Sequence, residues 1–188
     1  MMTRLTWICH GSTVANREAR FPLDEPLDER AVEATKAIAS LLQRADHVFA
    51  SPALRARQTA EALGLAAETA DDLADCDYGR WAGRSIYDLQ QTEAENLAGW
   101  MTQPDETPHG SESVTAMCAR VGAWMDGHLR LGGHAIAVTH AAILRAAIVS
   151  ALKAPASSYW LSDIEPLAIV RMTSNGNRWA LRLESASP

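Results

Sequence analysis

Hydrophobic residues along the chain form two kinds of pattern, short continuous runs and longer stretches with helical spacing. The continuous runs have the length and composition of buried β-strands, and they cover residues 5–9, 47–51 and 134–140. Stretches with apolar side chains three and four positions apart predict helices at residues 27–45, 52–63, 111–131 and 141–152. Strands that alternate with helices predict an α/β fold, a three-layer α/β/α sandwich around a mainly parallel sheet.

Capping and turn residues mark the limits of several of these elements. Asp28 stands before the first helix as a candidate N-cap. Pro52 occupies the expected first helical position of the second helix, and Gly64 follows the end of that helix. Near the C-terminus, alternating hydrophobic residues flank Asn175-Gly176, a dipeptide typical of tight turns. This pattern predicts an antiparallel C-terminal hairpin.

Residues 71–111 interrupt the regular alternation. They contain several glycines and prolines around one helix-like stretch, residues 85–101. We interpret residues 71–111 as an excursion that covers one end of the sheet. The chain, residues 1–188, is then a single domain, because its length suits one core with a small cap.

Composition narrows the class of protein. Hydrophobic residues make up 47% of the chain and charged residues 21%, as in ordinary globular proteins. A net charge of −6 argues against binding to nucleic acid or to an anionic membrane, although local arginines can still bind a small anion.

No apolar run approaches the roughly 20 residues that span a bilayer, and the N-terminal apolar run is too short for a secretory signal, so we expect a cytoplasmic protein. Three cysteines without C-x-x-C spacing predict reduced thiols.

Polar residues follow each of the three buried runs. His10 comes directly after the first run, a helix carrying Arg55 follows the second, and His140 ends the third. Because the carboxyl ends of parallel strands meet at one edge of a sheet, we expect these three side chains to lie together. A lone histidine at a strand end is more often structural than catalytic, so the inference depends on this convergence.

Such a set of groups suits phosphoryl transfer. A neutral imidazole can attack phosphorus, a guanidinium can hold two non-bridging oxygens, and a second imidazolium can share the developing charge. A carboxylic acid must protonate the leaving oxygen, and backbone amides around Gly11 offer further donors.

The order and spacing of these motifs resemble a known family. Residues 9–21 read CHGSTVANREARF, residues 50–63 read ASPALRARQTAEAL, and residues 73–83 read LADCDYGRWAG. Together with a strand that ends in His140, they resemble the histidine phosphatase (phosphoglycerate mutase-like) superfamily in order, from residue 5 to about residue 150. The first two segments joined are the specific part of this resemblance.

The resemblance implies roles for individual residues. His10 matches the phosphorylated nucleophile of the family, and His140 matches the second histidine that contacts the phosphate. Asp75 stands where the family usually has a glutamate as general acid. The residues that match phosphate-binding or substrate-side positions are Arg55, Gly11, Thr13, Asn16 and Arg20. The family's chemistry needs no metal ion and no cofactor, and we expect none here.

The chain also departs from the family pattern. The family signature is Arg-His-Gly, whereas Cys9 precedes His10 here, and losing one phosphate-binding charge costs about two to three powers of ten in rate. Asp75 has a shorter side chain than the usual glutamate, and Asp77 is an alternative acid. Ala141 follows the second histidine where a glycine is usual, which narrows access to the backbone.

Cys9 leaves three interpretations open. In the first interpretation another arginine compensates for the missing charge, and the candidates are Arg17, Arg20 and Arg57. In the second the enzyme is slow or altered. In the third catalysis is lost while ligand binding remains. A less supported alternative makes Cys9 a nucleophile, or a zinc ligand beside the two histidines.

The main hypothesis is a metal-independent phosphomonoester hydrolase that forms a phosphohistidine on His10 and acts on a small phosphorylated metabolite. One alternative is an α-ribazole phosphatase-like enzyme of cobalamin assembly, because the excursion at 71–111 has a similar size. Another is a non-catalytic phosphate-ligand binding or regulatory protein. Cys9 favours this second alternative, whereas the presence of both a nucleophile and an acid, Asp75, opposes it.

Two further expectations concern partners. Trp81 and Trp100 lie in the excursion and are candidates for contact with an organic leaving group. A free sheet edge and exposed tryptophans would permit a homodimer.

Overall fold

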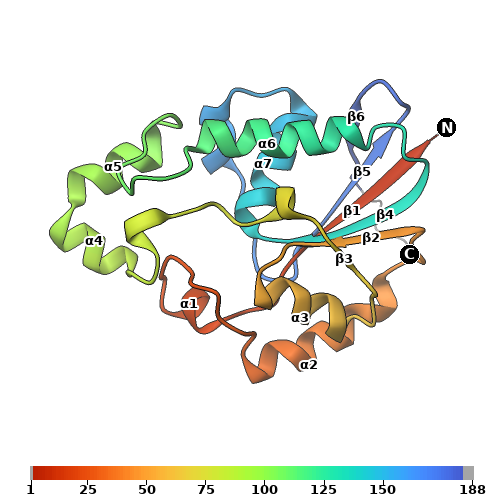
Figure 1. The fold of residues 1–188 in the computed structure, drawn as a ribbon, viewed down its shortest axis with the longest axis horizontal. Helices are drawn as coiled ribbons and strands as arrows, with labels where there is room; N and C mark the ends of the chain where they lie inside the picture. The colour runs from red at the N-terminus through yellow and green to blue at the C-terminus, as the bar shows by residue number, and fades with distance from the viewer. Residues whose placement is uncertain (1, 184–188) are drawn as a thin grey trace.

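The computed structural model describes residues 2–183 and contains a six-stranded sheet flanked by helices (Figure 1). The strands are β1 (Thr3–Cys9), β2 (His47–Ala50), β3 (Glu68–Thr69), β4 (Gly133–Thr139), β5 (Ile169–Ser174) and β6 (Trp179–Leu181). Their order across the sheet is β3-β2-β4-β1-β5-β6. The first four are parallel, whereas β5 is antiparallel to β1, and β6 to β5. The predicted α/β fold with its C-terminal hairpin is confirmed.

Helices cover both faces of the sheet. They are α1 (Val14–Arg17), α2 (Glu29–Ile38), α3 (Leu54–Ala62), α4 (Ile86–Thr92), α5 (Ala94–Thr102), α6 (Val114–Gly127) and α7 (Ala141–Leu152). In Figure 1, α2 and α3 lie on one face and α6 and α7 on the other. The short α1 and the pair α4 and α5 lie beyond the carboxyl ends of the parallel strands. None of the helices within residues 2–183 has both the length and the apolar character to cross a bilayer.

The alternation of side chains along β1 divides the interior into two cores. Leu5, Trp7 and Cys9 belong to the core under α6 and α7, where Trp7 packs against Trp124 with ring centroids 5.4 Å apart. Ile8 faces the other core, under α3. Because β1 is buried on both faces, it reads as a continuous apolar run rather than an alternating one.

Several predicted element limits differ from the structure. The helix predicted at 27–45 starts as expected, since Asp28 accepts a hydrogen bond from the Ala31 amide at 2.8 Å, but α2 ends at Ile38. A 3₁₀ turn follows at Ala39–Leu41, and beyond it Leu42 and Ala45 pack on the core under α3 as the chain turns into β2. Tertiary packing thus overrides a local preference for helix.

The next two predicted helices start later than expected. α3 begins at Leu54, not at Pro52, and its first amide donates to the Asp24 side chain at 2.7 Å. The helix predicted from 111 begins at Val114, because Ser113 is the N-cap and accepts from the Ala116 amide at 3.0 Å.

The helix-like stretch at 85–101 forms two helices, α4 and α5, which meet at Glu93. The Glu93 carboxylate pairs with Arg80 and Arg84, which fixes the bend. The aromatic and leucine side chains of this region form a small core of their own, with members Phe21, Trp81, Leu89 and Leu97. This core supports the segment that lies beside the carboxyl ends of the strands.

Candidate active site

The carboxyl ends of β1, β2 and β4 bring three predicted residues into one cavity. Parallel pairing continues past β1, since the His10 amide donates to the Thr139 carbonyl at 2.8 Å. The His10 and His140 rings lie with centroids 5.1 Å apart, although 130 positions separate them in the sequence. Arg55 enters from α3, and Asp75 comes from the segment after β3. These four side chains line a cavity of about 220 Å³.

His10 is buried, and the hydrogen bonds of its ring show which nitrogen holds the proton. Its Nδ1 lies 2.7 Å from the Gly11 carbonyl, which only accepts, so Nδ1 holds the proton. Burial first, then the neighbouring His140 and Arg55, lower the pKa of His10 to about 3. The ring is therefore neutral at physiological pH, with Nε2 as the basic atom.

Arg55 connects His10 to the candidate acid. Its Nε donates to His10 Nε2 at 3.3 Å, and its Nη2 pairs with Asp75 Oδ2 at 2.7 Å. Its Nη1 donates to the Leu23 carbonyl at 2.9 Å. The guanidinium is almost fully buried, so these three contacts fix its plane against the nucleophile.

His140 presents a second ring nitrogen to the cavity. Its Nε2 lies 2.7 Å from Ser51 Oγ, and a serine hydroxyl that donates to Nε2 leaves the proton on Nδ1. Nδ1 is 3.3 Å from Asp75 Oδ2 but is not aligned for a hydrogen bond, and it has no other partner among the described residues. Burial first, and then Arg55, lower the pKa of His140 well below its usual value. The ring is therefore neutral, and its Nδ1 lies nearest to the Asp75 carboxylate.

Of the two predicted acids, only Asp75 reaches the cavity. Its Oδ1 accepts from the Cys76 amide at 2.9 Å, and its Oδ2 faces Arg55 and His140. Asp77 is exposed and lies outside the cavity lining. The Ser111 hydroxyl and the Gly79 amide donate to the Asp77 carboxylate and lower its pKa. These contacts give Asp77 a role in holding the loop.

The residues after His10 shape the cavity wall. The Gly11 amide donates to Thr59 Oγ1 at 3.0 Å, so it is not the free donor that the sequence suggested. A Cβ at position 11 would lie 3.1 Å from Thr35 Oγ1, which explains the glycine by its close contact with α2. Thr13 and Asn16 line the cavity and form a reciprocal capping box at the start of α1.

Cys9 lies within the core and not on the cavity wall. Its side chain packs under α6 and α7, and burial raises the pKa of its thiol to about 12. The thiol is therefore protonated and inaccessible, which argues against Cys9 as a nucleophile. Within residues 2–183, no group of three His, Cys, Asp or Glu side chains is arranged to hold a metal ion.

The arginines suggested as replacements for the missing motif arginine occupy different places. Arg17 pairs with Asp28, and Arg57 is exposed on α3; neither lines the cavity. Arg20 lies at its exposed rim. Sequence reasoning missed Arg145 on α7, which does line the cavity. The available signal was its spacing, because a helix that begins after His140 carries residue 145 on the same face as residue 141.

Aromatic side chains form one wall of the cavity. Phe21, Tyr78, Trp100 and Tyr159 contribute to the lining. Trp81 is fully buried behind them and packs edge-on against Trp100, with ring centroids 6.0 Å apart. Of the two tryptophans predicted near the leaving group, Trp100 alone reaches the cavity.

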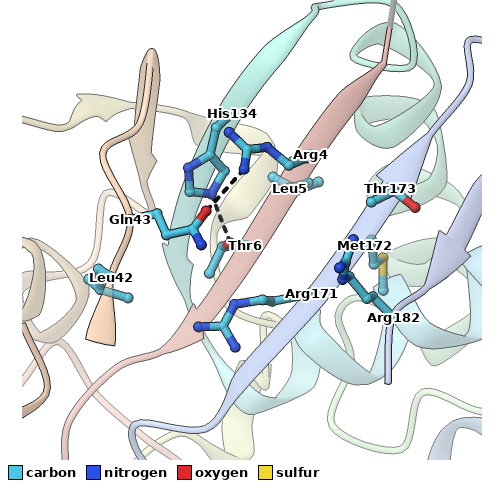
Figure 2. Close-up of a pocket in the computed structure, with 10 residues that line it drawn as sticks. All are labelled: Arg4, Leu5, Thr6, Leu42, Gln43, His134, Arg171, Met172, Thr173 and Arg182. Carbon is cyan, nitrogen blue, oxygen red and sulfur yellow. Dashed lines mark hydrogen bonds between the residues drawn. The ribbon is translucent and has the colours of Figure 1, made fainter. Parts of the chain in front are cut away.

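Figure 2 shows a second cavity, of about 110 Å³, between the amino-terminal half of β1 and strands β4 and β5. The buried His134 contacts Thr6 Oγ1 through Nε2 and the Arg44 carbonyl through Nδ1, both at 2.9 Å. Arg4 donates to Gln43 Oε1 at 3.0 Å. None of the predicted site residues lines this cavity, which lies at the opposite end of β1 from His10.

A sequence model of the histidine phosphatase superfamily, branch 1, matches residues 5–186. The chain belongs to this superfamily. The match covers the opening strand, both histidines and the C-terminal hairpin, so the resemblance noted in the motifs is confirmed over nearly the whole chain. Membership in the histidine phosphatases supports a phosphatase activity.

Two curated relatives differ in how much of their length they share with this chain. The adenosylcobalamin/alpha-ribazole phosphatase of Escherichia coli (strain K12) is 27% identical over 168 residues, 84% of this chain and 83% of that protein. The bifunctional protein Rv2228c of Mycobacterium tuberculosis is 30% identical over 128 residues, 63% of this chain. The matched part is 35% of the mycobacterial protein, so the chain spans about a third of that relative's length.

Solved structures share the histidine phosphatase fold over almost their full length. A mycobacterial glucosyl-3-phosphoglycerate phosphatase is 23% identical, with a TM-score of 0.87 and coverage of 98% of this chain and 99% of that one. The alpha-ribazole phosphatase of Shigella flexneri is 26% identical, with a TM-score of 0.84 and coverage of 96% and 95%. At 23% identity, the likeness to the glucosyl-3-phosphoglycerate phosphatase shows only that the two chains share a fold.

The buried environment of His10 predicts a ring that does not titrate between pH 5 and 8. Long-range ¹H–¹⁵N spectra should show Nδ1 protonated and Nε2 unprotonated throughout, with the signal assigned by loss in His10→Gln. The unfolded ring gains a proton near its usual pKa of 6.5 and the folded ring only near 3, so this group makes the free energy of unfolding fall as pH decreases between those values. A midpoint near 6.5 in the folded protein would contradict the assignment.

Proposed function

We propose that this chain hydrolyses small phosphomonoesters through a phosphohistidine on His10. The observation that carries the proposal is the state of His10, a neutral buried ring whose Nδ1 proton is fixed by the Gly11 carbonyl and whose Nε2 faces Arg55. A general binder of phosphate has no need of a nucleophile prepared in this way. The family supports the reaction class, and the cavity supports the roles of the individual residues.

In the first step, His10 Nε2 attacks phosphorus, a P–N bond forms, and the P–O bond to the leaving group breaks. Arg55 and the His140 Nδ1–H bind the non-bridging oxygens as negative charge develops on them. Asp75 donates a proton to the leaving oxygen.

In the second step, water attacks the phosphohistidine. The Asp75 carboxylate accepts a proton from this water, the P–N bond breaks, and the electron pair returns to His10 Nε2. Inorganic phosphate leaves, and His10 is again neutral. The Gly11 carbonyl stabilises the Nδ1–H throughout, so the ring keeps one orientation in both steps.

Replacing the nucleophile tests this route directly. We expect hydrolysis of an aryl phosphate at pH 5 to 7.5, with EDTA present, to fall at least about 10³-fold in His10→Ala because no P–N bond can form. The exposed His47→Ala is the matched control and should retain wild-type rates. Rapid quenching in base should trap an acid-labile phosphoryl group on the wild-type and His47→Ala chains and not on His10→Ala. Equal rates in wild type and His10→Ala would eliminate the phosphohistidine, and equal rates near zero would favour the non-catalytic ligand-binding alternative.

Asp75 and Asp77 differ in reach, so their amide variants should differ in activity. We expect Asp75→Asn to slow hydrolysis of an alkyl phosphate by about 10² to 10⁴, and that of a nitrophenyl phosphate far less, because a good leaving group needs no proton. Asp77→Asn should change neither rate by more than about twofold. A loss that is the same for both substrates would remove Asp75 from the role of acid.

A second candidate concerns the substrate. The aromatic wall of Phe21, Tyr78 and Trp100 suits a ring-containing leaving group, and two relatives at 26% and 27% identity bear the name alpha-ribazole phosphatase. We propose α-ribazole phosphate as the first specific substrate to assay. Its kcat/KM should exceed that of a simple sugar phosphate by at least about tenfold, and Trp100→Ala should reduce this ratio. Equal values for both substrates would reject the candidate.

A further inference from the structure

The phosphate site lacks the arginine that the family signature has before the histidine. Cys9 occupies that position, with its side chain on the face of the sheet that α6 and α7 cover. In the parallel register, Cys9 pairs with Thr139, and α7 begins two residues later at Ala141. The space that an arginine at position 9 would enter therefore borders the first turns of α7.

Arg145 lies on those turns and points to the same cavity. Ala141, Ala142 and Arg145 line the cavity from one face of α7. Arg145 Nε donates to the Ser162 carbonyl at 2.8 Å, and its guanidinium carbon lies 5.6 Å from the centre of the Tyr159 ring. These contacts orient the planar group along the cavity wall.

Arg145 differs from the other cavity arginines in its charge balance. Arg55 pairs with Asp75, and Arg20 pairs with Glu18. Within residues 2–183, no carboxylate lies within ion-pair distance of Arg145. A half-buried guanidinium without a carboxylate partner is suited to bind an anion. Its charge also acts at position 9, where it opposes the effect of burial on the pKa of the Cys9 thiol.

We propose that Arg145 replaces the missing signature arginine and binds a non-bridging oxygen of the phosphoryl group that His10 receives. The positive charge beside the phosphate is then provided by Arg145 on α7 instead of by a residue on β1. This inference rests on the proposed function for its reaction. Of the earlier candidates, Arg17 and Arg57 do not line the cavity, and Arg20 lies at its exposed rim and pairs with Glu18.

Inorganic phosphate is the deciding probe, because it contains the phosphoryl group and no second anionic group. We expect Arg145→Gln to weaken phosphate binding, measured by calorimetry, at least about tenfold and to lower kcat/KM on an aryl phosphate about 100-fold. Arg130→Gln is the matched control, since Arg130 also donates Nε to a backbone carbonyl, that of Gly176 at 3.2 Å, but lies outside the cavity. It should change neither quantity.

Restoring the signature arginine distinguishes phosphate binding from a structural role. In the Arg145→Gln background, Cys9→Arg should recover at least about tenfold of the lost kcat/KM, because the charge returns to the same oxygens. A folded double variant without recovery would overturn the proposal. If Cys9→Arg prevents folding, the comparison of phosphate affinities decides, and wild-type affinity in Arg145→Gln would overturn it.

The same measurements separate this inference from the proposed function. If the wild type shows no turnover but its phosphate affinity depends on Arg145, the binding role is supported and the hydrolase proposal fails. If turnover depends on His10 while Arg145→Gln binds phosphate and turns over like wild type, the hydrolase proposal stands and the role of Arg145 is rejected.

Discussion

The parallel pairing of β1 with β4 is the constraint on which the site depends. Seven register pairs, from Thr3 with Gly133 to Cys9 with Thr139, bring the two strand ends level. His10 and His140 each follow directly, so their rings meet at the same edge of the sheet. Since both strands are buried on both faces, a shift in register would expose apolar side chains, and the register is strongly specified. The position of the chemistry is thus a consequence of packing.

Burial has opposite consequences for the groups at this edge. It keeps both histidines neutral, because burial removes the water that would solvate a charged imidazolium. A neutral ring suits a nucleophile and a hydrogen-bond donor. The contacts of Arg55 with Asp75 and the Leu23 carbonyl replace the water that its buried guanidinium has lost. The same guanidinium links segments from α3, the loop after α1 and the segment after β3. A substitution at Arg55 would disturb all of them at once.

The change at position 9 illustrates how a signature can be modified while its surroundings remain. Cys9 fits the core beneath α7 as a small hydrophobic side chain, next to Trp7 and against the start of the helix. A core that accepts cysteine there carries no charged group at position 9, where the proposed phosphate site would otherwise have the signature arginine. Arg145 lines the same cavity from the next helix and carries a comparable charge. A family signature gives the position that usually carries a positive charge, whereas anion binding requires only that some residue places a positive charge in the cavity.

Local patterns were enough to predict the fold class, the hairpin at Asn175-Gly176 and the convergence of His10, Arg55 and His140. Hydrophobic periodicity and the alternation of strands with helices can be read from short segments, and the carboxyl ends of parallel strands lie at one edge of the sheet. The sequence did not decide which of Asp75 and Asp77 is the acid, because both lie in one loop with the same local pattern. Only the tertiary contacts of Asp75 with Arg55 and of Asp77 with Ser111 distinguish them. The spacing of Arg145 from Ala141 was visible in the sequence, but its place in the cavity was not. Its role depends on which face of α7 borders the cavity, and that is decided by packing against β1, over long distances in the sequence.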